Sequence, residues 1–131
     1  MKLAVLDTSV LLLIARGSIN LDSLREALAG YRLCVTKPVV EELGKLSRGS
    51  DERSRLAAWL RENVVGKLID VINEDCEGRE FDERIVCSAK KLDAVLITAD
   101  REMSKRARSV GVRVAMIRWS KRGIEEFFSI L

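Results

Sequence analysis

The chain has 131 residues, of which 47% are hydrophobic and 33% are charged, and its net charge is +3. This length and composition are typical of one globular domain with its own core, and they exclude a disordered or collagen-like chain. No apolar run approaches the roughly 20 residues that span a bilayer, and Asp7 interrupts the apolar start too early for a secretory signal peptide. We therefore expect a single domain over residues 1–131, located in the cytoplasm and without membrane association.

Short apolar runs alternate with segments of helical period through the first half of the chain. We expect strands at 3–6 and 32–36 and helices at 9–15, 21–29 and 38–46. Pro38 suits the first turn of its helix. Ser50 is a good N-cap for a further helix, whose residues Leu56, Leu60 and Val64 share one face.

The second half continues the alternation. We expect strands at 68–72, 94–98 and 112–117, helices at 81–92 and 101–110, a polar loop at 73–80 and an apolar tail at 123–131. Gly111 is placed to end the second of these helices. Strands that alternate with helices predict an α/β fold. We expect three layers, α/β/α, with a mainly parallel central sheet of about five strands.

Two residue types limit the chemistry that is available. The chain has no histidine, which excludes Ser-His and Cys-His nucleophile pairs and zinc sites that need histidine. Its three cysteines are far apart, and their odd number indicates neither a disulfide framework nor a zinc knuckle. Cys34 and Cys87 lie in apolar patterns and are expected to be small core residues.

Four acidic residues fall at the same end of consecutive strand-helix units. Asp7 follows the first expected strand and Asp100 the fourth, while Glu42 and Asp82 lie early in the helices after the second and third strands. The carboxyl ends of parallel strands share one edge of a sheet, so these side chains should converge. Converging carboxylates repel each other unless a cation is bound. Mg²⁺ or Mn²⁺ is the expected ion, since hard ions prefer oxygen ligands.

Such a site suits the hydrolysis of phosphodiester bonds, because a bound metal ion acidifies water and stabilises charge on phosphate oxygens. Residues 101–122 contain eight basic residues and one acidic residue, which leaves the rest of the chain with a net negative charge. A basic segment beside an acidic site is typical of a nucleic-acid-binding protein. The candidate RNA contacts are Arg101, Lys105, Arg106, Arg118, Lys121 and Arg122.

Each of these residues also has an ordinary structural interpretation. Asp7 and Asp100 could be helix N-caps, and Glu42 and Asp82 could be first-turn acids that complement a helix dipole. The basic segment could be a solvated helix face. The assignments could also shift to neighbouring acids, from Glu42 to Glu41 and from Asp82 to Glu80 or Glu83. Four acids at equivalent positions favour a site over four unrelated caps.

Four short motifs, taken together, resemble the PIN-domain nucleases over nearly the whole chain. They are Leu-Asp-Thr-Ser at 6–9, Val-Val-Glu-Glu-Leu at 39–43, Asp-Glu-Arg-Ile at 82–85 and Thr-Ala-Asp-Arg-Glu-Met at 98–103. The first motif departs from the commoner Asp-Thr-Asn. The loop before Asp82 is longer and more charged than is usual in the family.

The resemblance implies a Mg²⁺- or Mn²⁺-dependent endoribonuclease whose acidic quartet is Asp7, Glu42, Asp82 and Asp100. Hydroxyl groups that orient metal-bound water would be those of Thr8 or Ser9 and of Thr98. A fifth carboxylate remains open among Glu102, Asp75, Glu80 and Glu83.

Within the family, the chain is most similar to the archaeal branch related to nucleases that process small-subunit ribosomal RNA. VapC-type toxins of toxin–antitoxin pairs are the second branch. The expected partner is RNA. A homodimer, an antitoxin and a ribosome-assembly partner are open alternatives, as is a non-catalytic RNA-binding module on the same fold.

Overall fold

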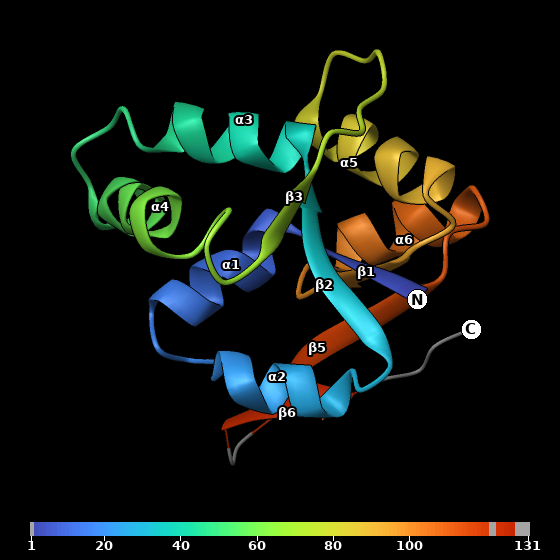
Figure 1. Cartoon of the computed structure of the whole chain (residues 1–131), viewed down its shortest axis with the longest axis horizontal. Helices are drawn as coiled ribbons and strands as arrows, with labels where there is room; N and C mark the ends of the chain where they lie inside the picture. Colours follow the sequence, from blue (N-terminus) through green and yellow to red (C-terminus); the bar gives the residue numbers. More distant parts are fainter. Residues whose placement is uncertain (1, 121–122, 128–131) are drawn as a thin grey trace.

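The computed structural model describes the backbone of residues 2–120 and 123–127 and the side chains of residues 2–117 (Figure 1). The first half of the chain forms β1 (Lys2–Leu6), α1 (Thr8–Ala15), α2 (Leu21–Ala27), β2 (Tyr31–Thr36), α3 (Lys37–Leu46) and α4 (Glu52–Asn63). The second half forms β3 (Asp70–Ile72), α5 (Phe81–Lys91), β4 (Val95–Thr98), α6 (Arg101–Ser109), β5 (Val114–Ser120) and β6 (Gly123–Phe127).

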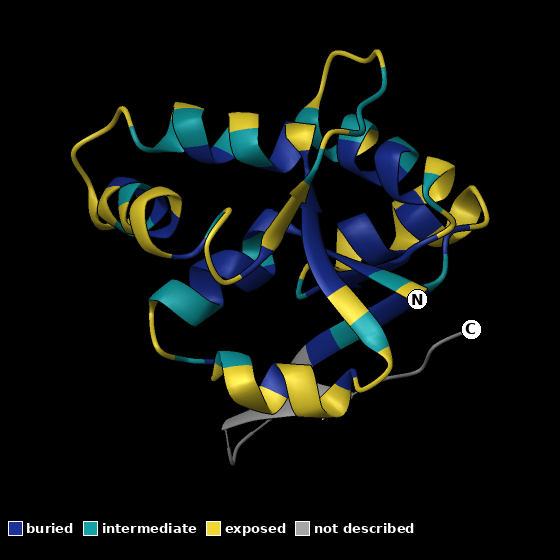
Figure 2. Cartoon of the chain, viewed as in Figure 1, coloured by how far each residue is buried: buried dark blue, intermediate teal, exposed yellow. Residues whose placement is uncertain are grey.

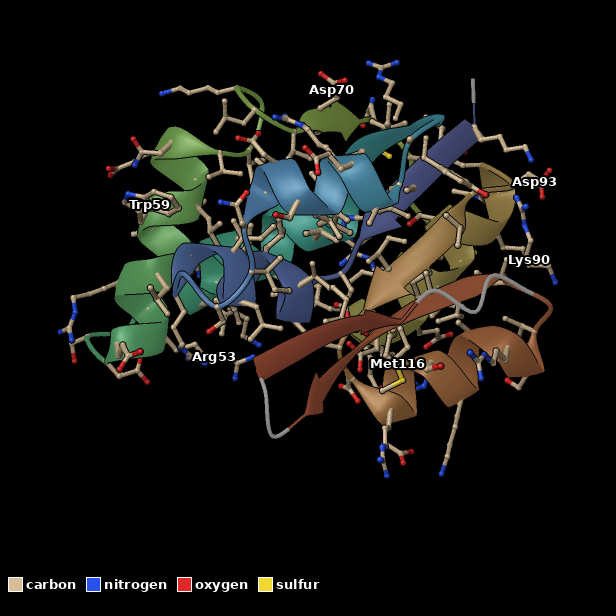
Figure 3. The ribbon with its side chains drawn as sticks, turned by 90° about the horizontal axis from the view of Figure 1, so that it is seen from below. Arg53, Trp59, Asp70, Lys90, Asp93 and Met116 are labelled. Atoms are coloured by element: carbon tan, nitrogen blue, oxygen red, sulfur yellow. A yellow bond between two sulfur atoms is a disulfide. The ribbon has the colours of Figure 1, made fainter. Side chains whose placement is uncertain are left out.

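The strands form one sheet in the order β3-β2-β1-β4-β5-β6. The first five strands in this order are mutually parallel, and β6 pairs with β5 in the antiparallel direction. The order reverses direction at β1 and β4, so right-handed crossovers place the helices after β1 and β2 on one face and α5 and α6 on the other. Figure 3 shows α2 and α4 on the opposite side of the sheet from α6.

The central strands are buried over most of their length. Residues 4–6 of β1 and 95–98 of β4 are all buried, as expected for parallel strands that are covered on both faces (Figure 2). The three-layer α/β/α prediction is therefore confirmed. None of the helices among the described residues is long and apolar enough to cross a membrane.

Two local predictions were wrong. Residues 123–127 were expected to belong to an apolar tail, but they form β6, which covers the edge of β5 and removes an exposed parallel edge. The helix predicted to begin at Ser50 has Asp51 as its N-cap, because the Asp51 carboxylate accepts hydrogen bonds from both the backbone nitrogen and the hydroxyl of Ser54, at 2.8 and 2.7 Å.

The cysteine prediction was also partly wrong. Cys34 is buried and free, as expected, but Cys87 forms a disulfide with Cys76. The spacing of the cysteines gave no sign of this bond, because it depends on how the loop after β3 folds back along α5. The bond ties this loop to the helix that begins with Phe81 and carries Asp82 in its first turn.

Candidate metal centre at the carboxyl edge of the sheet

All four predicted acids lie at the carboxyl edge of the parallel strands. Asp7 and Asp100 directly follow β1 and β4 and act as the N-caps of α1 and α6. Glu42 lies on α3 after β2, and Asp82 lies in the first turn of α5 after β3. Asp7 can therefore cap α1 and belong to the site at the same time, because one carboxylate oxygen caps the helix while the other faces neighbouring side chains.

Asp7 is the most buried of the four acids, with only 4% of its surface exposed. Its Oδ2 accepts hydrogen bonds from Ser9 Oγ at 2.9 Å and from Thr98 Oγ1 at 2.6 Å. Burial raises the pKa of Asp7 above its ordinary value, the hydroxyl hydrogen bonds of Thr98 and Ser9 oppose that rise, and the charge of Asp82 adds to it. An ionised Asp7 is therefore costly in the absence of a neighbouring positive charge.

Glu42 faces Asp7 from the neighbouring helix. Its Oε1 accepts a hydrogen bond from the hydroxyl of Thr8, the residue that follows Asp7. Burial raises the pKa of Glu42, the Thr8 hydroxyl lowers it, the charges of Asp7 and Asp82 raise it further, and the charge of Arg53 lowers it. The adjacent Glu41 points elsewhere and binds Arg84, so the structure distinguishes two acids that the sequence could not.

Asp82 connects the buried Asp7 and the half-buried Glu42 to the exposed Asp100. Burial raises the pKa of Asp82, the Arg106 guanidinium lowers it, and the charges of Asp100 and Glu80 raise it again. Asp100 is exposed, and its Oδ1 accepts backbone hydrogen bonds from Glu102 at 2.9 Å and Met103 at 3.4 Å. Mutual repulsion thus links the four carboxylates in one electrostatic group.

Ion pairing separates these four acids from their acidic neighbours. No quartet residue forms an ion pair with any side chain that the structure describes. Four neighbours do have basic partners. They are Glu41 and Asp75 with Arg84, Glu80 with Arg106, and Glu102 with Lys105. Three of the four open candidates for a fifth carboxylate are therefore paired with bases, and Glu83 is exposed to solvent.

Comparison with known proteins identifies the family of the chain. The family model described as "PIN like domain" matches residues 4–120. The chain belongs to the PIN-like domain family. Among curated proteins, ribonuclease VapC9 of Archaeoglobus fulgidus is 26% identical over 121 residues, which covers 92% of this chain and 87% of that protein.

Solved structures of PIN-domain proteins share the fold. The PIN domain endonuclease Utp24 superposes with a TM-score of 0.68 at 20% identity, covering 98% of this chain and 95% of its own. VapBC2 from Rickettsia felis, solved bound to a DNA fragment from its promoter, has a TM-score of 0.65 at 13% identity, covering 90% of this chain and 99% of its own. At these identities the likeness concerns the fold alone.

The PIN-like site suits a divalent cation that keeps part of its water shell. Among the described residues, no group of three or more acidic or cysteine side chains is arranged so that it could hold a metal ion. Mg²⁺ commonly binds one or two carboxylates directly and others through water. Acids that repel one another and form no ion pair with a described side chain, from the buried Asp7 to the half-buried Glu42 and Asp82, have the chemistry that such an ion would neutralise, so the residues fit the ion.

The predicted helper hydroxyls all lie within this group, but they contact carboxylates. Thr8 donates to Glu42, and Ser9 and Thr98 donate to Asp7. These bonds orient the carboxylate oxygens and satisfy part of their hydrogen-bonding capacity inside the protein.

The predicted RNA contacts fall into three groups. Arg106 is bound to Glu80, with 2.9 Å between Nη1 and Oε2. Arg101 and Lys105 are exposed on α6. The side chains of Arg118, Lys121 and Arg122 lie outside the described residues.

Arg84 makes contacts beside the candidate site that the sequence analysis did not predict. Its guanidinium binds Asp75 through Nε at 3.1 Å and Nη2 at 2.8 Å, and it binds Glu41 through Nη2 at 2.6 Å. Arg84 thereby joins α5, which carries Asp82, to α3, which carries Glu42. The sequence motif around Asp82 includes Arg84, but its partners come from segments that are distant along the chain.

Proposed function

We propose that this chain is an endoribonuclease that hydrolyses RNA phosphodiester bonds with Mg²⁺ or Mn²⁺ held by Asp7, Glu42, Asp82 and Asp100. The observation that carries the proposal is the selective absence of ion pairs for these four acids among the described residues, while Glu41, Asp75 and Glu80 have close basic partners. Repelling carboxylates that are buried or half-buried and form no ion pair are unfavourable, and a cation relieves that cost. The membership of the PIN-like domain family supports the same activity.

When bound, the divalent ion would supply an acidified water and stabilise the charge that develops on the phosphate. The chain's own residues prepare the site for this role. Thr98 and Ser9 fix the Asp7 carboxylate, and Thr8 fixes that of Glu42, so the ligands need little reorganisation when the ion binds. The raised pKa values of Asp7 and Glu42 make protonation compete with metal binding, so activity should increase as the pH rises.

A matched pair of neighbouring residues tests the site. Calorimetric titration of Mn²⁺ into the wild-type protein should show binding that Asp7→Asn and Asp82→Asn both weaken. Glu83→Gln, one residue away and exposed, should leave binding unchanged. The same variants are then assayed for cleavage of a structured RNA, where Asp7→Asn should remove activity. Equal Mn²⁺ affinity and cleavage in Asp82→Asn and wild type would reject the assignment.

A non-catalytic module gives a different result. RNA binding that neither Mg²⁺ nor Asp100→Asn affects, together with no cleavage in either metal ion, would favour a binding module over an enzyme.

Two biological roles are compatible with this chemistry. A VapC-type toxin with an antitoxin partner is favoured by the similarity to ribonuclease VapC9 of Archaeoglobus fulgidus. A role in ribosomal RNA processing follows from the branch that the sequence motifs resemble most. Growth arrest on expression that Asp7→Asn abolishes would support the toxin. Unimpaired growth with active protein would favour processing.

A further inference from the structure

A groove between α6 and β5 carries a row of basic side chains. Its volume is about 190 Å³, and it is lined by Arg101, Ser104, Lys105, Arg108 and Met116. The four α6 residues are spaced at i, i+3, i+4 and i+7, so they share one face of the helix. Figure 3 shows Met116 between the β5 ribbon and α6, on the side of the sheet away from α2 and α4.

The cations of this groove are not neutralised by described acids. Arg101 and Arg108 form no ion pair with any described side chain. Lys105 lies 3.8 Å from Glu102, but both side chains are strongly exposed, at 78% and 84%. Such an exposed pair contributes little and can be exchanged for another anion.

Ser104 adds a hydroxyl group to the groove. The residue is only 3% exposed, and its hydroxyl forms no hydrogen bond with a described residue. Ser104 nevertheless lines the groove. A hydroxyl between cationic groups is a common donor to phosphate oxygens.

Arg106 provides the contrast on the same helix. It lies on the side of α6 that faces α5, where it is bound to Glu80 close to Asp82. One basic residue of α6 is thus used to balance acids beside the candidate metal centre. The basic face of Arg101, Lys105 and Arg108 remains available for an external anion.

The position of this face determines the ligand. Arg101 directly follows Asp100, and the row continues along α6 for about 10 Å at the usual rise per residue, enough for roughly two or three consecutive phosphates. A polyanion is repelled by the four carboxylates and needs positive charge beside them to approach. Among the described residues that line the groove, Met116 is the one apolar side chain, which suits a phosphate backbone better than a protein helix.

We propose that this α6–β5 groove binds the sugar-phosphate backbone of a single RNA strand that leads into the acidic site. This inference rests on the proposed ribonuclease function. Arg108 thereby becomes an RNA contact that the sequence analysis did not select, and Arg106 loses that role.

The test compares two triple variants of equal charge. Arg101→Gln/Lys105→Gln/Arg108→Gln removes the groove cations. Arg48→Gln/Arg55→Gln/Lys67→Gln removes three exposed cations around α4, away from α6 (Figure 1). Affinity for a single-stranded oligoribonucleotide is measured in EDTA, which prevents metal-dependent cleavage, between about 50 and 200 mM salt.

The slope of log affinity against log salt is negative, and each phosphate contact to a single strand contributes roughly 0.7 to its magnitude. Loss of three contacts should therefore make the slope less steep by about 2. Affinity at low salt should fall at least about tenfold. The α4 variant should match the wild type, and Arg108→Gln alone should show about a third of the change in slope. In the groove variant, Mn²⁺ affinity should be kept or slightly strengthened, because positive charge near the carboxylates is removed. Circular dichroism checks that both triple variants fold.

The results separate this inference from the proposed function. If the wild type cleaves RNA and the groove variant has the same salt slope and KM as the wild type, the groove proposal is wrong and the ribonuclease proposal stands. If RNA binding depends on the groove cations but no RNA is cleaved in Mg²⁺ or Mn²⁺, the groove proposal is supported and the ribonuclease proposal is wrong. If both triple variants lose RNA affinity equally, RNA binding depends on overall surface charge and not on the groove, and the inference is wrong.

Discussion

Reduction of the Cys76–Cys87 disulfide should destabilise the protein by about 3 kcal/mol. The bond links residues that are 11 positions apart. In the chain-entropy treatment, a crosslink of this span removes conformational freedom from the unfolded chain worth about 3 kcal/mol at 25 °C. For a domain of this length, that loss corresponds to a fall in melting temperature of about 10 °C.

The folded state should survive reduction, because other contacts hold the same loop. The Asp75 carboxylate binds Arg84 at 2.8 Å, and the Asp75 carbonyl accepts a hydrogen bond from Lys91 Nζ at 2.9 Å. The backbone nitrogen of Lys37 donates to the Glu74 carbonyl at 3.1 Å. The loss is therefore expected to act mainly through the unfolded chain, with little change in helix content or in Mn²⁺ affinity at 25 °C.

The assay is thermal unfolding followed by circular dichroism, with and without a phosphine reductant. Thiol titration of the denatured protein should find one thiol, that of Cys34, before reduction and three after it. The Cys76→Ser/Cys87→Ser variant should match the reduced wild type and should not respond to reductant. A melting temperature that falls by less than about 2 °C, with the bond shown to be broken, would refute the chain-entropy reasoning.

Three further outcomes follow from the site and the backbone. The folded protein holds protons on Asp7 more tightly than the unfolded chain does, so the metal-free wild type should lose stability as the pH rises above the ordinary Asp pKa of 3.8. Asp7→Asn should then raise the melting temperature of the metal-free protein at pH 7 by about 4 °C, and this gain should disappear in acid. A variant that melts below the wild type at pH 7 would show that the ionised, buried Asp7 does not destabilise the protein. Arg84→Gln should lower the free energy of unfolding in urea by about 2 kcal/mol and weaken Mn²⁺ binding, because the Arg84 side chain is only 15% exposed and joins α3 to α5. If its effect is no larger than that of Glu41→Gln, Arg84 does not hold the two helices together. Gly111→Ala should lower the free energy of unfolding by about 1 kcal/mol, because φ is +85° at this position. Gly44→Ala within α3 should raise it by about 0.5 kcal/mol. Equal effects of the two substitutions in denaturant unfolding would show that backbone conformation does not explain them.

The sequence by itself determined the fold class and the edge of the sheet where the acids lie. Apolar runs such as residues 3–6 and 94–98 are long enough for buried strands and too short for helices, and the segments between them have helical period. Since parallel strands share one carboxyl edge, the positions of Asp7 and Asp100 directly after two strands were sufficient to place them together. Their role as metal ligands stays a prediction.

Only the tertiary structure decided which charges are paired. Glu41 and Glu42 are adjacent in the sequence, but a helix turns by about 100° per residue, so one meets Arg84 and the other meets Thr8. The same rotation sends Arg106 to Glu80 and leaves Arg101 and Arg108 facing the groove. Like the Cys76–Cys87 bond, these outcomes depend on partners from distant segments. A local pattern shows which way a residue faces on its own helix, and the packing of the other elements determines what it meets there.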